Sequence, residues 1–516
     1  MNGAESLVRT LLAGGVDVCF TNPGTSEMHF VAALDAVPGM RCSLCLFEGG
    51  VTGAADGYYR MAGRPASTLL HLGPGLANGV SNLHNAKKAG SGIVNIVGEH
   101  ATYHIELDAP LTADIEGIAG PVSHWVKTSL SSKDVARDGA EAIQAAQVAP
   151  GQIATLILPG DTAWNEGSGP AEPLPVPARP KVDADRVTNA AKALAAGGGD
   201  TLILLGGAAV QEANLRLAGQ IAAKTGCGLL TEWANARLDR GAGRIEVNRI
   251  PFVVEKALNV LKPYRRIVLA GAKPPVAFFA YPNKPSILTQ DGTEFIELAD
   301  ASQDIASALE GLVQELDATN AKPAGISQPN KPALPSGPIE PSGIAAVLGN
   351  LMPENAVIVD ESVTTGREFF PQTAGAAPHA WLNNRGGSIG YGLPVATGAA
   401  MACPGHKVIA LEGDGSAMYT VQSLWTIARE NLDVTVLVFS NRSYKILRGE
   451  LTNVGVQNPG PRAVDMLTLN RPNLDWVSMA KGMGVEAQKV DDLTAFAKAF
   501  EKGLSVDGPY LIELEM

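Results

Sequence analysis

Two oxygen-bearing side chains that follow apolar segments of strand length are the strongest chemical signal in this sequence. Asp414 lies at the end of the run VIALEG, and Asn441 follows the run VTVLVFS 27 positions later. A right-handed crossover connection brings the carboxyl ends of two parallel strands to the same edge of a sheet. Carboxylate, amide and backbone carbonyl oxygens suit Mg²⁺, whose coordination is often completed by phosphate and water. We therefore expect Asp414 and Asn441 to bind a magnesium ion together with a phosphate group.

Glycines beside Asp414 support the phosphate part of this interpretation. Gly413 and Gly415 allow the backbone to approach a diphosphate, and the N–H groups that open the following helix at Ser416 can bind its charge. We expect this helix to run through Arg429. A GDG turn alone is also explained as a strand-to-helix connection with an N-cap, so the matching position of Asn441 is what favours the metal site.

A lone acid, Glu48, is the second chemical signal. It ends the apolar run LCLF and meets a helix-like segment rich in glycine and alanine, GGVTGAADGYYR. Desolvation disfavours the charged form of a carboxyl group in such a place, so the group can hold and share a proton. An acid favoured by the helix dipole is the structural alternative. We expect the small residues of this helix to pack closely beside a cofactor and a partner subunit.

Composition and charge exclude several classes of function. The chain has 516 residues and a formal net charge of −12, which argues against a nucleic-acid partner because phosphate binding needs clustered Lys and Arg. No apolar run approaches the roughly 18 to 20 residues that cross a bilayer, so we expect no membrane partner and a cytoplasmic location. Cys42 and Cys45 form a CxxC pair, but they lie in a strand-like run where a redox or metal role has little support.

Two proline-rich stretches divide the chain into three blocks. The stretches 166–183 (EGSGPAEPLPVPARPKVD) and 319–342 (TNAKPAGISQPNKPALPSGPIEPS) have the proline density of extended linkers. The blocks 1–165, 184–318 and 343–516 each alternate Val/Ile/Leu runs with helical segments, which is typical of parallel sheets covered on both faces. We therefore predict an α/β protein with three doubly wound parallel-sheet domains, in which ligands bind at the carboxyl ends of the strands.

The spacing of the GDG turn and Asn441 resembles the signature of thiamine-diphosphate (ThDP) enzymes. The order of the blocks resembles the pyrimidine-binding, central and diphosphate-binding domains of the acetolactate synthase, pyruvate oxidase and benzoylformate decarboxylase group, over essentially the whole chain. In that family the metal ligands are the Asp, the Asn and a backbone carbonyl two residues further on, which implies Asp414, Asn441 and the Ser443 carbonyl here. The cofactors implied by the resemblance are ThDP and Mg²⁺.

The resemblance also implies positions that bind the organic cofactor. The segment NRGGSIGYGLP (384–394) resembles the one that bends the cofactor, with Ile389 as the apolar wedge between its rings and the Gly387 carbonyl as acceptor for its amino group. Glu48 corresponds to the glutamate that shares a proton with the pyrimidine ring, so that the cofactor can attack a 2-oxo acid and release CO₂. The whole implied set is Asn22, Pro23, Gly24, Asn78, Thr364, Gly387, Ser388, Ile389, Gly413, Asp414, Gly415, Ser416, Asn441 and Tyr444.

Two segments, NPGTSEM (22–28) and LHLGPGLAN (70–78), come close to benzoylformate decarboxylase and imply a substrate side. Histidine can act as an acid or base near neutral pH, and His71 matches a functional histidine of that enzyme, so Glu48 and His71 are the expected catalytic residues. A structural histidine is the alternative. Thr25 and Glu99 are expected in the substrate pocket, although Glu99 could equally lie on a surface loop.

The resemblance implies an active site shared between two subunits. Glu48 of one subunit would serve a cofactor held by Asp414 and Asn441 of the other. We therefore expect a homodimer at minimum, and a homotetramer by analogy with the group, that acts on a small 2-oxo acid.

Departures from the family leave the substrate open. Phe47 precedes Glu48 where many members have histidine, and the segment PPVAFFAYP lacks a histidine of benzoylformate decarboxylase. The turns LLGG (204–207) and LAGAKPP (269–275) could be remnants of a flavin site, although we favour a protein without FAD. The expected activity is decarboxylation of a 2-oxo acid, with carboligation, of acetolactate-synthase-like or benzoylformate-decarboxylase-like type. The alternatives are a ThDP lyase of 2-hydroxyacyl-CoA or oxalyl-CoA type, supported only by Arg265 and Arg266, and a non-catalytic cofactor-binding subunit.

Overall fold

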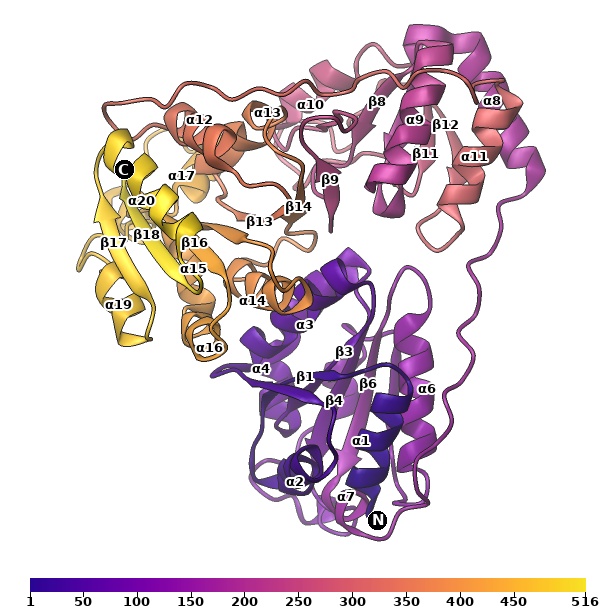
Figure 1. Ribbon diagram of the computed structural model, residues 1–516, viewed down its shortest axis with the longest axis vertical. Helices are drawn as coiled ribbons and strands as arrows, with labels where there is room; N and C mark the ends of the chain where they lie inside the picture. Colours follow the sequence, from indigo (N-terminus) through magenta and orange to yellow (C-terminus); the bar gives the residue numbers. More distant parts are fainter.

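The computed structural model describes residues 1–516 as three α/β units joined by two extended segments (Figure 1). The first unit is drawn in indigo and purple, the central unit in magenta, and the third in orange and yellow. Each unit is built on its own sheet, and apart from one strand all pairings are parallel. The predicted fold class is therefore confirmed. No helix of the structure combines the length and the apolar character needed to cross a membrane.

The first unit has a six-stranded sheet in the order β2-β1-β3-β4-β6-β5. Its strands are β1 (Val18–Asn22), β2 (Arg41–Leu44), β3 (Ala66–Leu70), β4 (Ile93–Glu99), β5 (Trp125–Thr128) and β6 (Ile153–Pro159). Its helices are α1 (Gly3–Ala13), α2 (Met28–Ala36), α3 (Glu48–Ala62), α4 (Leu72–Ala89), α5 (Ile115–Ala119), α6 (Val135–Gln147) and α7 (Gly160–Trp164). Strands β3, β4 and β6 are buried along their whole length, as their continuous apolar runs predict.

The central unit has a five-stranded sheet in the order β10-β8-β7-β11-β12. Its strands are β7 (Thr201–Leu205), β8 (Gly228–Thr231), β10 (Asn248–Arg249), β11 (Arg266–Ala270) and β12 (Glu294–Ala299). Its helices are α8 (Ala184–Gly197), α9 (Glu212–Thr225), α10 (Val254–Leu261) and α11 (Ile305–Glu315). The chain from α11 to the third unit crosses the top of Figure 1 without forming a helix or a strand.

The third unit has a seven-stranded sheet in the order β17-β18-β16-β15-β13-β14-β9. Its strands are β13 (Ala356–Glu361), β14 (His379–Asn383), β15 (Val408–Gly413), β16 (Val434–Ser440), β17 (Glu486–Val490) and β18 (Tyr510–Glu515). Its helices are α12 (Pro341–Leu351), α13 (Phe369–Gln372), α14 (Gly392–Ala402), α15 (Asp414–Ala417), α16 (Ser423–Arg429), α17 (Lys445–Asn453), α18 (Pro461–Asp465), α19 (Trp476–Gly482) and α20 (Leu493–Ser505).

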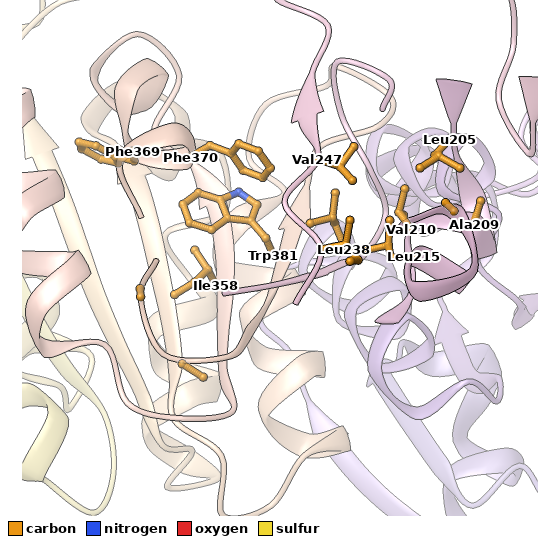
Figure 2. Packing of buried hydrophobic residues seen from close by; sticks show 14 of the residues in the cluster. Leu205, Ala209, Val210, Leu215, Leu238, Val247, Ile358, Phe369, Phe370 and Trp381 are labelled. Carbon is orange, nitrogen blue, oxygen red and sulfur yellow. The ribbon is translucent and has the colours of Figure 1, made fainter. Parts of the chain in front are cut away.

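One strand of the third sheet comes from the central part of the chain. β9 (Leu238–Arg240) pairs antiparallel with β14, a pairing that the sequence did not predict. The buried guanidinium of Arg240 donates to the Thr373 hydroxyl at 2.8 Å and lies 3.8 Å from the centre of the Phe370 ring. Figure 2 shows Leu238 and Val247 packed beside Phe370 and Trp381 in one continuous apolar cluster. The central and third units therefore share a core.

The first and third units meet through α3 and α14, which lie side by side in Figure 1. A Cβ atom at Gly57 of α3 would lie 2.1 Å from the Val395 carbonyl oxygen, and one at Gly398 of α14 would lie 1.8 Å from the Ala54 carbonyl oxygen. Only glycine permits so close a contact. At these positions the small residues of α3 thus pack against a helix of the same chain. The expected contacts of α3 with a cofactor and a partner subunit stay predictions.

Candidate active site

The turns that follow β15 and β16 meet at one edge of the third sheet. Asp414 Oδ2 accepts a hydrogen bond of 2.6 Å from the backbone N–H of Arg442. Asn441 Oδ1 accepts one of 3.0 Å from the backbone N–H of Ser443. The parallel pairing of the two strands brings Asp414 to the turn 441–443, far away in sequence.

The donors at this edge fit a hard cation. Asp414 is only 3% exposed, and burial raises the pKa of its carboxyl group to about 6. A bound cation would offset the cost of keeping this group charged. The Asp414 carboxylate, the Asn441 amide and the Ser443 carbonyl all offer oxygen, the donor that Mg²⁺ prefers. The Arg442 guanidinium pairs with Glu515 instead.

The predicted single helix over residues 416–429 is wrong. A 3-10 turn at Met418–Thr420 separates α15 from α16. The Thr420 hydroxyl donates to the Gly390 carbonyl at 2.9 Å, which holds the chain in this turn. The hydrogen bond of Thr420 therefore connects the segment that follows Asp414 to the glycine-rich segment 384–390.

The glycine-rich segment 384–390 is held by a buried acid that the sequence analysis missed. Glu361, the last residue of β13, accepts hydrogen bonds from the N–H groups of Gly390 at 2.8 Å and Gly392 at 2.9 Å. Gly387 and Gly390 have φ angles of +81° and +87°, which favour glycine. Between them, the Ile389 side chain is only half-buried. Ile389 is therefore free to contact a ligand while its backbone is fixed.

A second buried acid lies beside the first. Glu412 on β15 is the register neighbour of Glu361 on β13. Burial raises the pKa of Glu361 to about 7. Burial and the adjacent Glu361 raise the pKa of Glu412 well above its usual range, and its carboxyl oxygens have no hydrogen-bond partner. The pair therefore favours a proton on Glu412.

Glu48 is the first residue of α3 and lies at the carboxyl edge of the first sheet. Its Oε2 atom accepts a hydrogen bond of 3.0 Å from Asn78 Nδ2 on α4. A Cβ atom at Gly75 would lie 3.1 Å from Glu48 Oε1, so this glycine leaves room for the carboxylate. Glu48 is half-buried and Asn78 is exposed. The carboxylate is thus oriented by Asn78 and remains accessible.

His71 is paired with Glu27, which lies in the segment 22–28 but was not among the expected site residues. His71 Nδ1 lies 2.8 Å from Glu27 Oε2, which also accepts the Gly24 N–H at 2.7 Å. Glu27 is 3% exposed, and burial raises the pKa of its carboxyl group. The absence of a side chain at Gly98 makes room for Glu27, since a Cβ atom there would lie 1.7 Å from its Oε1 atom. Glu27 and His71 therefore form a hydrogen-bonded acid–histidine dyad.

The other predicted positions lie at the same strand ends. Asn22, the last residue of β1, and Pro23 and Gly24, which follow it, are half-buried, whereas Thr25 is exposed. Glu99 is 5% exposed at the end of β4, so the alternative of a surface loop is wrong. Burial raises the pKa of Glu99, and its Oε1 atom accepts the His100 N–H at 2.7 Å. In the third unit, Ser416 is buried beside Gly413, the Tyr444 ring packs on Gly415, and Thr364 lines a cleft of about 500 Å³.

The CxxC pair shows no reactive arrangement. Cys42 is exposed and Cys45 is buried, and all five cysteines are free. Burial raises the pKa of the Cys45 thiol to about 12, and the pKa of the Cys42 thiol is raised by partial desolvation and by the nearby Glu430 carboxylate. Neither residue is therefore present as a reactive thiolate near neutral pH.

Both ends of the chain match known cofactor-binding domains. Residues 1–120 match the N-terminal TPP binding domain of thiamine pyrophosphate enzymes, and residues 368–514 match their C-terminal TPP binding domain. The chain belongs to the thiamine pyrophosphate enzyme family. Thiamine pyrophosphate is another name for ThDP, so the predicted family and the predicted organic cofactor are confirmed. Glu48 and His71 lie in the first matched segment, and Asp414 and Asn441 lie in the second.

Relatives within the family extend over the whole chain. IlvX of Mycobacterium tuberculosis, provisionally named an acetolactate synthase large subunit, is 49% identical and covers 100% of this chain and 99% of its own. Benzoylformate decarboxylase of Pseudomonas aeruginosa is 30% identical and covers 97% of this chain and 96% of its own. The solved ThDP-dependent 4-hydroxybenzoylformate decarboxylase of Rhodococcus jostii RHA1 has the same fold, with a TM-score of 0.88 at 24% identity over 100% of this chain and 99% of that chain.

Proposed function

We propose that this family member decarboxylates a 2-oxo acid with ThDP and Mg²⁺, and that it can pass the activated product to a carbonyl acceptor. The observation that carries the proposal is the meeting of Asp414 with the turn of Asn441 and Ser443 inside the C-terminal cofactor-binding domain. When bound, the cofactor supplies a carbon nucleophile and takes up the electron pair that CO₂ leaves behind. Asp414, Asn441 and the Ser443 carbonyl would hold Mg²⁺, which would bind the diphosphate of the cofactor.

The remaining residues bind and orient the cofactor in this proposal. Glu48 shares a proton with the pyrimidine ring, and Asn78 orients the Glu48 carboxylate. The Gly387 carbonyl would accept a hydrogen bond from the cofactor's amino group, and the Ile389 side chain would contact its rings. The other members of the cofactor set described from the sequence contribute the edge of the pyrimidine pocket (Asn22, Pro23, Gly24) and the diphosphate pocket (Thr364, Ser388, Gly413, Gly415, Ser416, Tyr444).

His71 is the acid or base on the substrate side in this proposal. Its Nδ1 atom is engaged by Glu27, so its Nε2 atom is the one that can exchange a proton with substrate or product. Thr25 and Glu99 are assigned to the same pocket. Buried Glu99 holds its proton more readily than an exposed acid does, which suits a site that accepts an anionic 2-oxo acid.

Aromatic side chains of the central unit support a bulky apolar substrate. The Phe278 ring packs against Gly387, where a Cβ atom would lie 2.7 Å from it. Phe278 also lies edge-on to Trp233, with ring centres 5.0 Å apart, and to Phe279 at 4.7 Å. Phe278 and Phe279 remain 38% and 53% exposed. Such open aromatic faces beside the cofactor segment favour a 2-oxo acid with an aromatic side chain.

We propose a homodimer at minimum as the active unit, in line with the family resemblance, and a cytoplasmic location. Exposed apolar side chains beyond the strand ends of the first unit support an interface there: Met28 after β1, Leu46 after β2, and Tyr103 and Leu107 after β4. Exposed apolar side chains of this size are common on surfaces that another chain covers. Whether dimers pair further into a homotetramer is decided by light scattering.

The alternatives receive less support. Arg265 and Arg266 lie at the amino end of β11, away from the edge where a nucleotide would bind, and are engaged by Gln290 and Asp200. The glycine turns of a potential flavin site pack on each other, since a Cβ atom at Gly206 would lie 2.7 Å from the Gly271 carbonyl oxygen. We therefore propose an enzyme without CoA or FAD, and an absorbance spectrum of the purified protein tests the flavin part.

A screen of 2-oxo acids tests the proposed function. The protein is supplied with ThDP and Mg²⁺, and CO₂ release and condensation products are measured with benzoylformate, 4-hydroxybenzoylformate and pyruvate. We expect release from the aromatic acids to exceed release from pyruvate, and we expect Glu48→Gln to abolish it. Activity that survives in Glu48→Gln contradicts the catalytic assignment, and a preference for pyruvate contradicts the aromatic pocket.

A further inference from the structure

Two buried amide side chains on α4 form hydrogen bonds with the backbone on both sides of Ile389. Asn85 Nδ2 donates to the Ser388 carbonyl at 2.9 Å, and Asn85 Oδ1 accepts the Ser388 N–H at 3.1 Å. Asn82 Nδ2 donates to the Gly390 carbonyl at 3.3 Å. Asn85 is 0% exposed and Asn82 is 2% exposed. The half-buried Ile389 lies between Ser388 and Gly390, the two residues that these amides hold.

The same two amides reach the start of α3. Asn85 Nδ2 also donates to Asn82 Oδ1 at 2.9 Å, and Asn82 Nδ2 also donates to the Gly49 carbonyl at 2.8 Å. Gly49 directly follows Glu48. Every N–H of both amides is used, and the orientation of each amide is fixed because carbonyl oxygens need donors and the Ser388 N–H needs an acceptor. A fully satisfied buried network of this kind has one arrangement.

The backbone next to Ser388 also has a glycine that allows this close contact with α4. A Cβ atom at Gly386 would lie 2.4 Å from Asn85 Oδ1, so glycine lets the segment lie flat on α4. On the opposite side, Glu361 holds the Gly390 N–H. The backbone around Ile389 is therefore held between an amide pair from the first unit and a carboxyl group from the third.

We propose that Asn82 and Asn85 are positioning residues that fix the place of Ile389, so that the segment 388–390 is shaped for the bound form of ThDP before the cofactor arrives. This inference rests on the cofactor-contacting role given to Ile389 under the proposed function. Preorganisation lowers the cost of binding, because the protein does not have to order the segment when the cofactor enters. Loss of either amide should therefore weaken ThDP binding without removing any group that touches the cofactor.

The test measures ThDP binding to the full-length protein with Mg²⁺ and without substrate, by calorimetry or by quenching of tryptophan fluorescence. Asn85→Ala and Asn82→Ala are expected to weaken binding about tenfold, as loss of buried hydrogen bonds in a preorganised site does. The matched control is Asn95→Ala, which removes an equally buried amide that links Thr68 and Thr155 inside the first unit. We expect the control to lower the thermal midpoint but to leave the ThDP affinity unchanged. Equal loss in all three variants, or full affinity in Asn85→Ala, overturns the proposal.

A double variant shows whether the amides act through Ile389. If they do, Asn85→Ala and Ile389→Ala together weaken binding by less than the product of the separate effects. Independent effects overturn the positioning role. Should Asn85→Ala not fold, Asn85→Asp replaces it, because it keeps the shape and the acceptor but loses both donated bonds. A wild-type protein that binds ThDP yet decarboxylates no 2-oxo acid would contradict only the proposed function, since the binding measurements do not depend on turnover.

Discussion

His71 Nδ1 lies 2.8 Å from Glu27 Oε2, and the carboxyl group is almost fully buried beneath the imidazole. A carboxylate in this position fixes the orientation and the tautomer of the ring. Because the pKa of Glu27 is raised, a fall in pH protonates this carboxylate at a higher pH than it would protonate an exposed glutamate. The dyad therefore couples the proposed substrate-side histidine to pH.

Glu27→Gln should lower kcat/KM for the preferred 2-oxo acid about tenfold, because a positioned acid–base group contributes at least that much. In the wild type we expect kcat/KM to fall as the pH is lowered through the raised pKa of Glu27, since only the carboxylate supports His71. In Glu27→Gln this acid-side fall should flatten. Steady-state pH profiles measure both effects, with Asp35→Asn, at an exposed position of the same unit, as the control. A profile of unchanged shape would remove Glu27 from the proposed mechanism.

Asp414→Ala should abolish the stabilisation that ThDP and Mg²⁺ give the wild type. Asp414 offers the only carboxylate among the proposed metal ligands, so its loss removes the charge that holds the cation. We expect no rise in thermal midpoint when both are added, and we expect EDTA to produce the same result in the wild type. Asp491→Ala, at an exposed site of the same unit, is the control. A full ThDP-dependent rise in Asp414→Ala would contradict the metal site.

The sequence was sufficient for the features that depend on neighbouring residues. Continuous apolar runs predicted β15 and β16, and the position of Asp414 at a strand end predicted that it lies beside the turn that follows β16. Glu27 was missed because its burial depends on the empty space above Gly98, which no local pattern records. Its sequence signal was an acid in a segment that otherwise matches the family.

Other features depend on contacts between distant parts of the chain. β9 reads as a short polar stretch, and it becomes a strand because β14 offers an unpaired edge and an aromatic surface for Arg240. The helix after Asp414 breaks because Thr420 bonds to Gly390. The glycines of α3 predicted that another segment packs closely on this helix, but only the structure shows that this segment is α14 of the same chain.

Raising the pH from about 5 to 7 should destabilise the folded protein through Glu361. Its folded pKa of about 7 lies above the value of 4.5 for an ordinary glutamate, so the folded state keeps a proton that the unfolded state releases. The contribution of this proton to the free energy of unfolding is therefore fully present below the pKa of Glu361 in the unfolded state. It is lost as the pH rises through the pKa in the folded state, by up to about 1.4 kcal/mol per pH unit for one proton. Glu361→Gln should reduce this slope, measured as the thermal midpoint against pH. Glu354→Gln, at an exposed position, should not.

Mixing two inactive variants tests the arrangement of the active site between subunits. If Glu48 serves the cofactor held by the other subunit, a heterodimer of Glu48→Gln and Asp414→Ala has one site with both changes and one site with none. Random assortment during co-expression then restores about a quarter of the wild-type activity, since about half the dimers are mixed and each has one intact site of two.

The matched control for this experiment is co-expression of Asp414→Ala with Asn441→Ala. Both changes affect the same turn, where Asp414 contacts the 441–443 backbone, so every site in the mixed dimer carries one defect and no activity returns. Within one chain, Asn82 already links the start of α3 to Gly390, so an arrangement in which each chain completes its own site is the direct competitor. That arrangement predicts no recovery in either mixture. Recovery with the Glu48→Gln pair alone is therefore expected only if the cofactor lies between two chains.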